Sequence, residues 1–103
     1  NILKNSFEAM PDGGKISIST RLKDDNIVVS ITDTGSGISK EDVQRVFDPF
    51  YSAKVNGTGL GLALTMKTVE GHRGEIICKS TIDKGTTMVI SFPIESCGKD
   101  IIE

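Results

Sequence analysis

The chain has 103 residues, which is the length of one domain of ordinary size. Hydrophobic residues make up 37% and charged residues 25%, so a packed core is expected and a highly charged, disordered tail is excluded. Twelve basic residues oppose fourteen acidic ones, and the formal net charge of −2 gives no overall field that attracts nucleic acid or an anionic membrane. No apolar run approaches the roughly 18 residues that span a bilayer, so we expect no direct membrane contact.

Two cysteines, Cys78 and Cys97, are too few for a disulfide framework and have no ligand partner at metal-binding spacing. We interpret both as reduced thiols. This composition predicts a cytoplasmic location for the chain, while the sequence leaves open whether the parent protein is anchored in a membrane.

The first half of the chain predicts a helix followed by a hairpin. Residues 1–10 repeat apolar side chains at helical spacing without a preceding cap, so we expect the helix to start upstream. Residues 11–14, Pro-Asp-Gly-Gly, stop the helix. Residues 15–22 and 27–33 then alternate as two strands around a polar turn.

The second half predicts two helices and a second hairpin. Ser39 is a suitable N-cap for a short helix to about Phe47, and a longer apolar stripe runs from 62 to 71. Strands are expected at 75–80 and 86–92. The predicted fold is therefore α+β: a two-layer sandwich with helices on one face of a mixed, mostly antiparallel sheet, spanning 1–96, with a loose tail at 97–103.

Asp33 is the most informative single residue. Alternation puts its carboxylate on the face of the strand that carries Ile27, Val29 and Ile31, where an unpaired charge is costly. Either a protein group or a ligand must donate to it, and an amine-bearing heterocycle such as adenine would suit a carboxylate followed by glycines. The alternative is an ordinary turn or capping carboxylate.

The glycines of residues 57–61, Gly-Thr-Gly-Leu-Gly, precede a predicted helix. Free backbone N–H groups at a helix start favour phosphate, although the pattern is neither the P-loop nor the dinucleotide motif. The alternative is a flexible loop. Lys54, just before these glycines, is a mobile charge that could reach a terminal phosphate, or simply a surface lysine.

Asn1 and Asn5 share a helical face, and their amides could hold a hydrated cation and phosphate oxygens. Glu8 lies near Asn5 on that face and could assist. A solvated helix face is the alternative. Phe47, Phe50 and Tyr51 cluster in a loop, where they predict either a partner surface or packing at the base of the loop.

Four segments resemble the motifs of sensor histidine kinases, in the family's order. Residues 1–9 (NILKNSFEA) are similar to the N box, 33–38 (DTGSGI) to the G1 box, 47–54 (FDPFYSAK) to the F box and 57–62 (GTGLGL) to the G2 box. The resemblance extends to about residue 94. It implies the Bergerat ATP-binding fold, without the strand and half-helix that normally precede the N box.

The resemblance also implies roles for individual residues. Asp33 would accept from the adenine amino group, with Thr86 beside it. The other residues implied in binding Mg-ATP are Asn1, Asn5, Gly35, Gly37, Ile38, Lys54, Gly57, Thr58, Gly59, Leu60 and Gly61. Asn5 is the implied Mg²⁺ ligand, and Asn5, Lys54 and Glu8 are the candidates for a catalytic role.

The implied function is the catalytic domain of a protein-histidine kinase, which transfers the ATP γ-phosphoryl to a histidine on a separate dimerisation domain, upstream of a response regulator. His72 is the only histidine of the chain and does not lie in a phosphoacceptor motif. Alternatives are a Bergerat-fold ATPase and a nucleotide-binding module without turnover. In the related ATPases a glutamate acts as general base four residues before the metal-binding asparagine, where this chain has Asn1.

Overall fold

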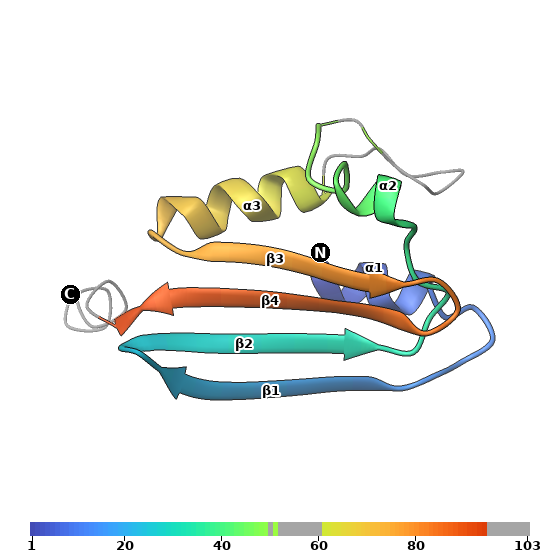
Figure 1. Cartoon of the computed structure of the whole chain (residues 1–103), viewed down its shortest axis with the longest axis horizontal. Helices are drawn as coiled ribbons and strands as arrows, with labels where there is room; N and C mark the ends of the chain where they lie inside the picture. The colour runs from blue at the N-terminus through green and yellow to red at the C-terminus, as the bar shows by residue number, and fades with distance from the viewer. Residues whose placement is uncertain (50, 52–60, 95–103) are drawn as a thin grey trace.

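Among the residues that the structure describes, four strands form one sheet in the order β1-β2-β4-β3 (Figure 1). The computed structural model describes residues 1–49, 51 and 61–94. The strands are β1 (Ile16–Lys23), β2 (Asn26–Asp33), β3 (Glu75–Thr81) and β4 (Gly85–Pro93). Each of the three pairings is antiparallel, so the parallel pairing of a mixed sheet is not seen among the described residues.

In the described part of the chain, three helices accompany the sheet. They are α1 (Ile2–Glu8), α2 (Lys40–Val43) and α3 (Gly61–Gly71). Ser39 caps α2 as expected, since its hydroxyl accepts from the Asp42 N–H at 3.2 Å. The expectation that this helix reaches Phe47 is wrong, because after Val43 the chain tightens into turns with i to i−3 bonds, such as that from Arg45 N–H to the Asp42 carbonyl.

The core lies between the helices and one face of the sheet. Its buried centre joins Ile2 of α1, Val69 of α3, Ile76 of β3 and Met88 of β4. Partly buried side chains that pack around this centre are Ile31, Phe47, Leu62, Met66, Cys78, Ile90 and Phe92. The α+β two-layer architecture predicted from the hydrophobic pattern is confirmed.

The helices do not cover the whole face. Ile18 and Leu22 of β1 point to the same side as the core but are 57% and 71% exposed, and Phe7 of α1 is 70% exposed. Val28 departs from the alternation argument, because it is buried although it lies on the opposite face of β2. β2 is a central strand, and Val28 is flanked in register by Arg21 and Ser91.

Membrane crossing by a helix finds no support in this fold. Within residues 1–49, 51 and 61–94, no helix has both the length and the apolar character needed to cross a bilayer.

A tight turn closes the β1–β2 hairpin. Lys23 pairs with Asn26, so the loop has two residues, and both of them have positive φ: 50° at Asp24 and 63° at Asp25. This is the backbone of a type I′ turn, in which glycine is favoured at the second position because a side chain there strains the left-handed conformation.

Replacing Asp25 with glycine should therefore stabilise the domain by about 0.5 kcal/mol, which corresponds to a rise in Tm of ~2–4 °C. Thermal unfolding followed by circular dichroism measures the change. Lys84→Gly is the matched control, since Lys84 lies in the other hairpin turn without a positive φ. An equal rise in both variants would contradict the turn argument.

Candidate nucleotide-binding site

Asp33 ends β2 as a buried carboxylate with a fixed orientation. The side chain is only 4% exposed. Its Oδ1 atom accepts two backbone hydrogen bonds, from Gly35 N–H at 2.9 Å and from Thr86 N–H at 3.2 Å. Two donors on one oxygen offset much of the free-energy cost of burying the charge, and they fix the orientation of the carboxylate plane.

The second carboxylate oxygen of Asp33, Oδ2, takes no part in these two hydrogen bonds. No described residue donates to Oδ2, and yet the described part of the chain contains no buried side-chain oxygen or nitrogen without a partner. The Oδ2 atom therefore reaches the surface. An oriented, charged acceptor at the edge of the core fits a ligand N–H, which is the chemistry expected of an adenine amino group.

Residues 34–38, here called the G1 loop, are held from both sides. The Ser36 N–H donates to the Ala9 carbonyl behind α1, and the Ser36 carbonyl accepts from Asp83 N–H in the β3–β4 turn at 2.7 Å. Gly37 has a φ of +77°, and a Cβ there would collide with the Thr81 carbonyl. The loop thus packs backbone against backbone, which explains its glycines.

Thr86 lies opposite Asp33 in the β2–β4 register and is 8% exposed. Its hydroxyl lies 2.8 Å from that of Ser80, which pairs with Thr86 across β3 and β4. Sequence reasoning missed Ser80. The signal was present, because alternation places Ser80 on the face of β3 that carries Ile76 and Cys78.

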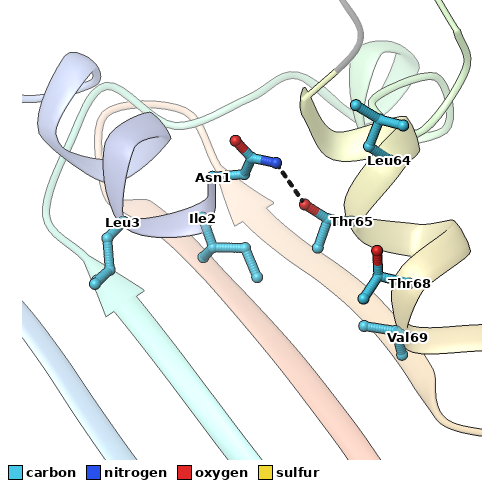
Figure 2. Close-up of a pocket in the computed structure, with 7 residues that line it drawn as sticks. All are labelled: Asn1, Ile2, Leu3, Leu64, Thr65, Thr68 and Val69. Atoms are coloured by element: carbon cyan, nitrogen blue, oxygen red, sulfur yellow. Dashed lines mark hydrogen bonds between the residues drawn. The ribbon is translucent and has the colours of Figure 1, made fainter. Parts of the chain in front are cut away.

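Asn1 connects α1 to the start of α3. Its Nδ2 donates to the Gly61 carbonyl at 3.1 Å and to the Thr65 hydroxyl at 3.3 Å, the second of which is drawn in Figure 2. Asn5 lies one turn further along α1 and is half-buried, whereas Glu8 is exposed. The Asn1 amide therefore lies beside Gly61, and its N–H₂ group is bound to α3.

A hollow of about 390 Å³ opens between α1 and α3 (Figure 2). Its lining residues are Asn1, Ile2, Leu3, Leu64, Thr65, Thr68 and Val69. Asp33 and Thr86 do not line it. Its lining is apolar except for Asn1, Thr65 and Thr68.

The loop aromatics have separate placements. Phe47 packs against the core, which supports packing at the base of the loop. The Arg45 guanidinium stacks 4.7 Å from the centre of the Tyr51 ring. A hydrogen bond with Asp42, followed by desolvation and the Asp42 charge, raises the pKa of the Tyr51 hydroxyl. Phe50 lies outside the described residues.

Several predicted site residues also lie outside the described part of the chain: Lys54, Gly57, Thr58, Gly59 and Leu60. Gly61 is described and begins α3. Ile38 is described, and its N–H donates to the Ser80 hydroxyl at 2.7 Å.

His72 and Cys78 lie in surroundings that suit a structural role. The His72 Nδ1 lies 2.8 Å from the Thr68 carbonyl, to which it donates, and the ring meets Phe92 edge-on. Burial, together with the nearby Asp33 charge, raises the pKa of the Cys78 thiol, so this cysteine stays protonated near neutral pH.

Comparisons with known proteins identify the family of the chain. The sequence pattern of the "Histidine kinase-, DNA gyrase B-, and HSP90-like ATPase" family matches residues 1–96, and the chain belongs to that family. It is 43% identical over 95 residues to sporulation kinase E of Bacillus subtilis, and 38% identical over 103 residues to the signal transduction histidine-protein kinase AtoS of Escherichia coli. These alignments cover 91% and 99% of this chain but 13% and 17% of the relatives.

Solved structures show the same fold. The catalytic domain of histidine kinase ThkA has a TM-score of 0.79 at 31% identity, covering 92% of this chain and 64% of that one. The mycobacterial sensor histidine kinase MprB has a TM-score of 0.80 at 29% identity, with 89% and 64% covered. The predicted resemblance is confirmed: this is an ATP-binding catalytic domain of the sensor histidine kinase type, and it spans a small part of its curated relatives.

A substitution at Gly85 tests how tightly the backbone packs against Asp33. Its φ is +120°, and a Cβ there would collide with the Asp33 carbonyl oxygen. Gly85→Ala should destabilise the domain by on the order of 2–4 kcal/mol, because strain and a backbone clash combine. Gly71→Ala is the matched control, since a Cβ at Gly71 meets nothing within 4 Å. Denaturant unfolding of both variants measures the difference, and equal stabilities would contradict the packing argument.

Proposed function

We propose that this chain binds Mg-ATP with the adenine amino group on Asp33 and transfers the γ-phosphoryl to a histidine of a separate dimerisation domain in the same parent protein. In that reaction a P–N bond to the imidazole forms, the bond from the γ-phosphorus to the bridging oxygen breaks, and ADP leaves. A response regulator would take the phosphoryl group next. We place the domain in the cytoplasm, where ATP is supplied.

The observation that carries the proposal is the fixed carboxylate of Asp33. Oδ1 is held by two backbone donors, and Oδ2 is left to accept from a ligand. A 6-amino purine supplies that donor, whereas a 6-oxo purine presents a second acceptor. The family of the chain and the kinase names of its relatives support the same ligand.

The α1 and α3 residues suit the phosphate end of the nucleotide. The Asn5 amide oxygen is a hard ligand of the kind that Mg²⁺ accepts alongside water, and bound Mg²⁺ would supply charge neutralisation of the phosphates. Gly61, at the first turn of α3, adjoins Asn1. We assign phosphate contacts to Asn1, Gly61 and the glycines before it, with Lys54 near the terminal phosphate and Glu8 in an outer position.

The acceptor histidine must come from outside this sequence. His72 is the only histidine in the chain, and it follows the C-terminal end of α3, whereas Asn1 contacts the N-terminal end. The 11 residues of that helix separate the two positions by about 16 Å. The His72 ring is also engaged by Thr68 and Phe92. Neither observation suits a phosphorylated imidazole.

The ATPase alternative needs a base at the position of Asn1. Instead, this side chain donates two hydrogen bonds to α3, a role that a carboxylate cannot perform. An amide also has no useful basicity near neutral pH. Phosphoryl transfer relies mainly on positioning and charge neutralisation, so the site can serve an incoming imidazole without a base for water.

Asp33→Asn is the direct test of base recognition. The Gly35 and Thr86 N–H groups should keep the amide oxygen at the Oδ1 position, so that N–H₂ replaces Oδ2 and faces the ligand. ATP binding should weaken by on the order of 10–100-fold. GTP binding should weaken less or become tighter, because the 6-oxo group of guanine can accept a hydrogen bond from the new N–H₂ group. Isothermal titration calorimetry with both nucleotides and Mg²⁺ measures the two affinities.

Thermal melts provide the control for this substitution. A merely structural carboxylate predicts a lower Tm without nucleotide and an unchanged ratio of ATP to GTP affinity, whereas a ligand-binding carboxylate predicts a small change in Tm and a lower ratio. Equal affinity of the unmodified domain for ATP and GTP would remove Asp33 from base recognition.

The rate of phosphate release from ATP distinguishes the kinase proposal from the ATPase alternative. The unmodified domain should bind ATP and hydrolyse it barely, since it lacks a base that typically contributes about 10²–10⁴-fold. Asn1→Glu introduces a carboxylate but removes the bonds to Gly61 and Thr65, so Asn1→Ala, which removes the same bonds, is its matched control. Faster release by the glutamate variant than by the alanine variant is expected. Brisk turnover by the unmodified chain would favour the ATPase.

A further inference from the structure

Ser80 is the centre of a small hydroxyl network beside Asp33. Its Oγ accepts from the Ile38 N–H of the G1 loop at 2.7 Å and donates to the Gly85 carbonyl at 2.9 Å. The third partner is the Thr86 hydroxyl at 2.8 Å. Ser80 therefore contacts the loop that follows Asp33, the first residue of β4 and the residue whose N–H donates to Asp33.

Counting protons determines the direction of the Ser80–Thr86 bond. A hydroxyl has one proton and two lone pairs. The Ser80 proton goes to the Gly85 carbonyl, which can only accept, and one lone pair receives the Ile38 N–H. The remaining lone pair must receive the Thr86 proton. The reverse direction would leave the Ser80 and Gly85 oxygens 2.9 Å apart with no proton between them.

Once its proton is given to Ser80, the Thr86 hydroxyl has only lone pairs to offer to other groups. The Asp33 carboxylate, which pairs with Thr86 in the β2–β4 register and accepts its backbone N–H, is also an acceptor. The two side chains that border this part of the site therefore both require donors from whatever binds there. An exocyclic amine carries two N–H groups, whereas a purine carbonyl carries none.

We propose that Ser80 is a specificity-determining positioning residue: by taking the Thr86 proton, it keeps Thr86 as an acceptor and strengthens the preference for 6-amino over 6-oxo purine nucleotides. This inference rests on the proposed binding of ATP through Asp33. Ser80 does not need to touch the nucleotide. Its role is exerted through the direction of one hydroxyl proton.

The test compares ATP with inosine triphosphate, which differs from ATP only in its 6-oxo group and N1 proton. In the unmodified domain, calorimetry should show a clear preference for ATP. In Ser80→Ala the Thr86 proton becomes free to donate to the 6-oxo oxygen, so the ratio of the two affinities should fall about tenfold. If the role of Ser80 is purely structural, Ser80→Ala should weaken the binding of both nucleotides equally. The ratio of the two affinities would then be unchanged, which would overturn the proposal.

A double-mutant cycle with Thr86→Val isolates the mechanism. Without the Thr86 hydroxyl, Ser80→Ala should no longer change the ratio of affinities, since the proton that it controls is gone. If Ser80→Ala lowers the ratio by the same factor whether threonine or valine follows Gly85, the proton argument is wrong. Ser80→Thr keeps the hydroxyl and should retain the preference for ATP.

Two further outcomes are informative. Should Ser80→Ala unfold, Ser80→Cys fills a similar space with a weaker hydrogen-bonding group and should lower the ratio in the same direction, and an unchanged ratio there would overturn the proposal. Failure of the unmodified domain to bind ATP would instead overturn the proposed function, so the two failures are distinguishable.

Discussion

The paired hydrogen bonds to Asp33 Oδ1 are the interaction on which the rest of the site depends. They connect the end of β2 to the G1 loop through Gly35 and to β4 through Thr86. A neutral side chain of the same size would keep the shape of this junction but not its charge. Because the donors are backbone groups, they cannot rotate away, and the orientation of the carboxylate is fixed before any ligand arrives.

Close backbone packing around that carboxylate makes the site rigid on the side of the base. The Asp33 carbonyl lies against Gly85, and the Thr81 carbonyl lies against Gly37. The end to which we assign the phosphates is built differently, since there the Asn1 side chain joins α1 to α3. In the proposed binding mode, the sheet and its turns recognise the base, and the helix ends hold the phosphates.

Much of this arrangement follows from the sequence pattern. Period-two alternation gives the four strands to within one or two residues, and it places Asp33 on the core face without any knowledge of its partners. The end of α2 was missed because the choice between α and i to i−3 turns after Val43 depends on weak local preferences. The burial of Val28 was missed because it reflects neighbours on both sides of a central strand, and a single strand does not reveal which strands flank it.

In the site too, the sequence pattern indicates which face a residue occupies but not which distant residues it contacts. Alternation could have found Ser80, but its three partners come from the G1 loop and the start of β4, 42, 6 and 5 residues away in the chain. The Asn1 contacts span 60 and 64 residues. Spacing along one helix indicates which face a side chain occupies, and it does not indicate which distant group that face meets.

The hydrogen bonds that hold the G1 loop involve backbone amide protons whose exchange with solvent can be measured. Four backbone amides, those of Gly35, Ile38, Asp83 and Thr86, donate into the Asp33 and Ser80 cluster or the loop between them. Exchange of the Ile38, Asp83 and Thr86 protons with solvent requires residues 33–38 to separate from the β3–β4 hairpin, whereas the Gly35 proton reports opening within the loop itself. Their protection factors therefore measure the free energy that holds the base side of the site together, independently of any catalytic readout.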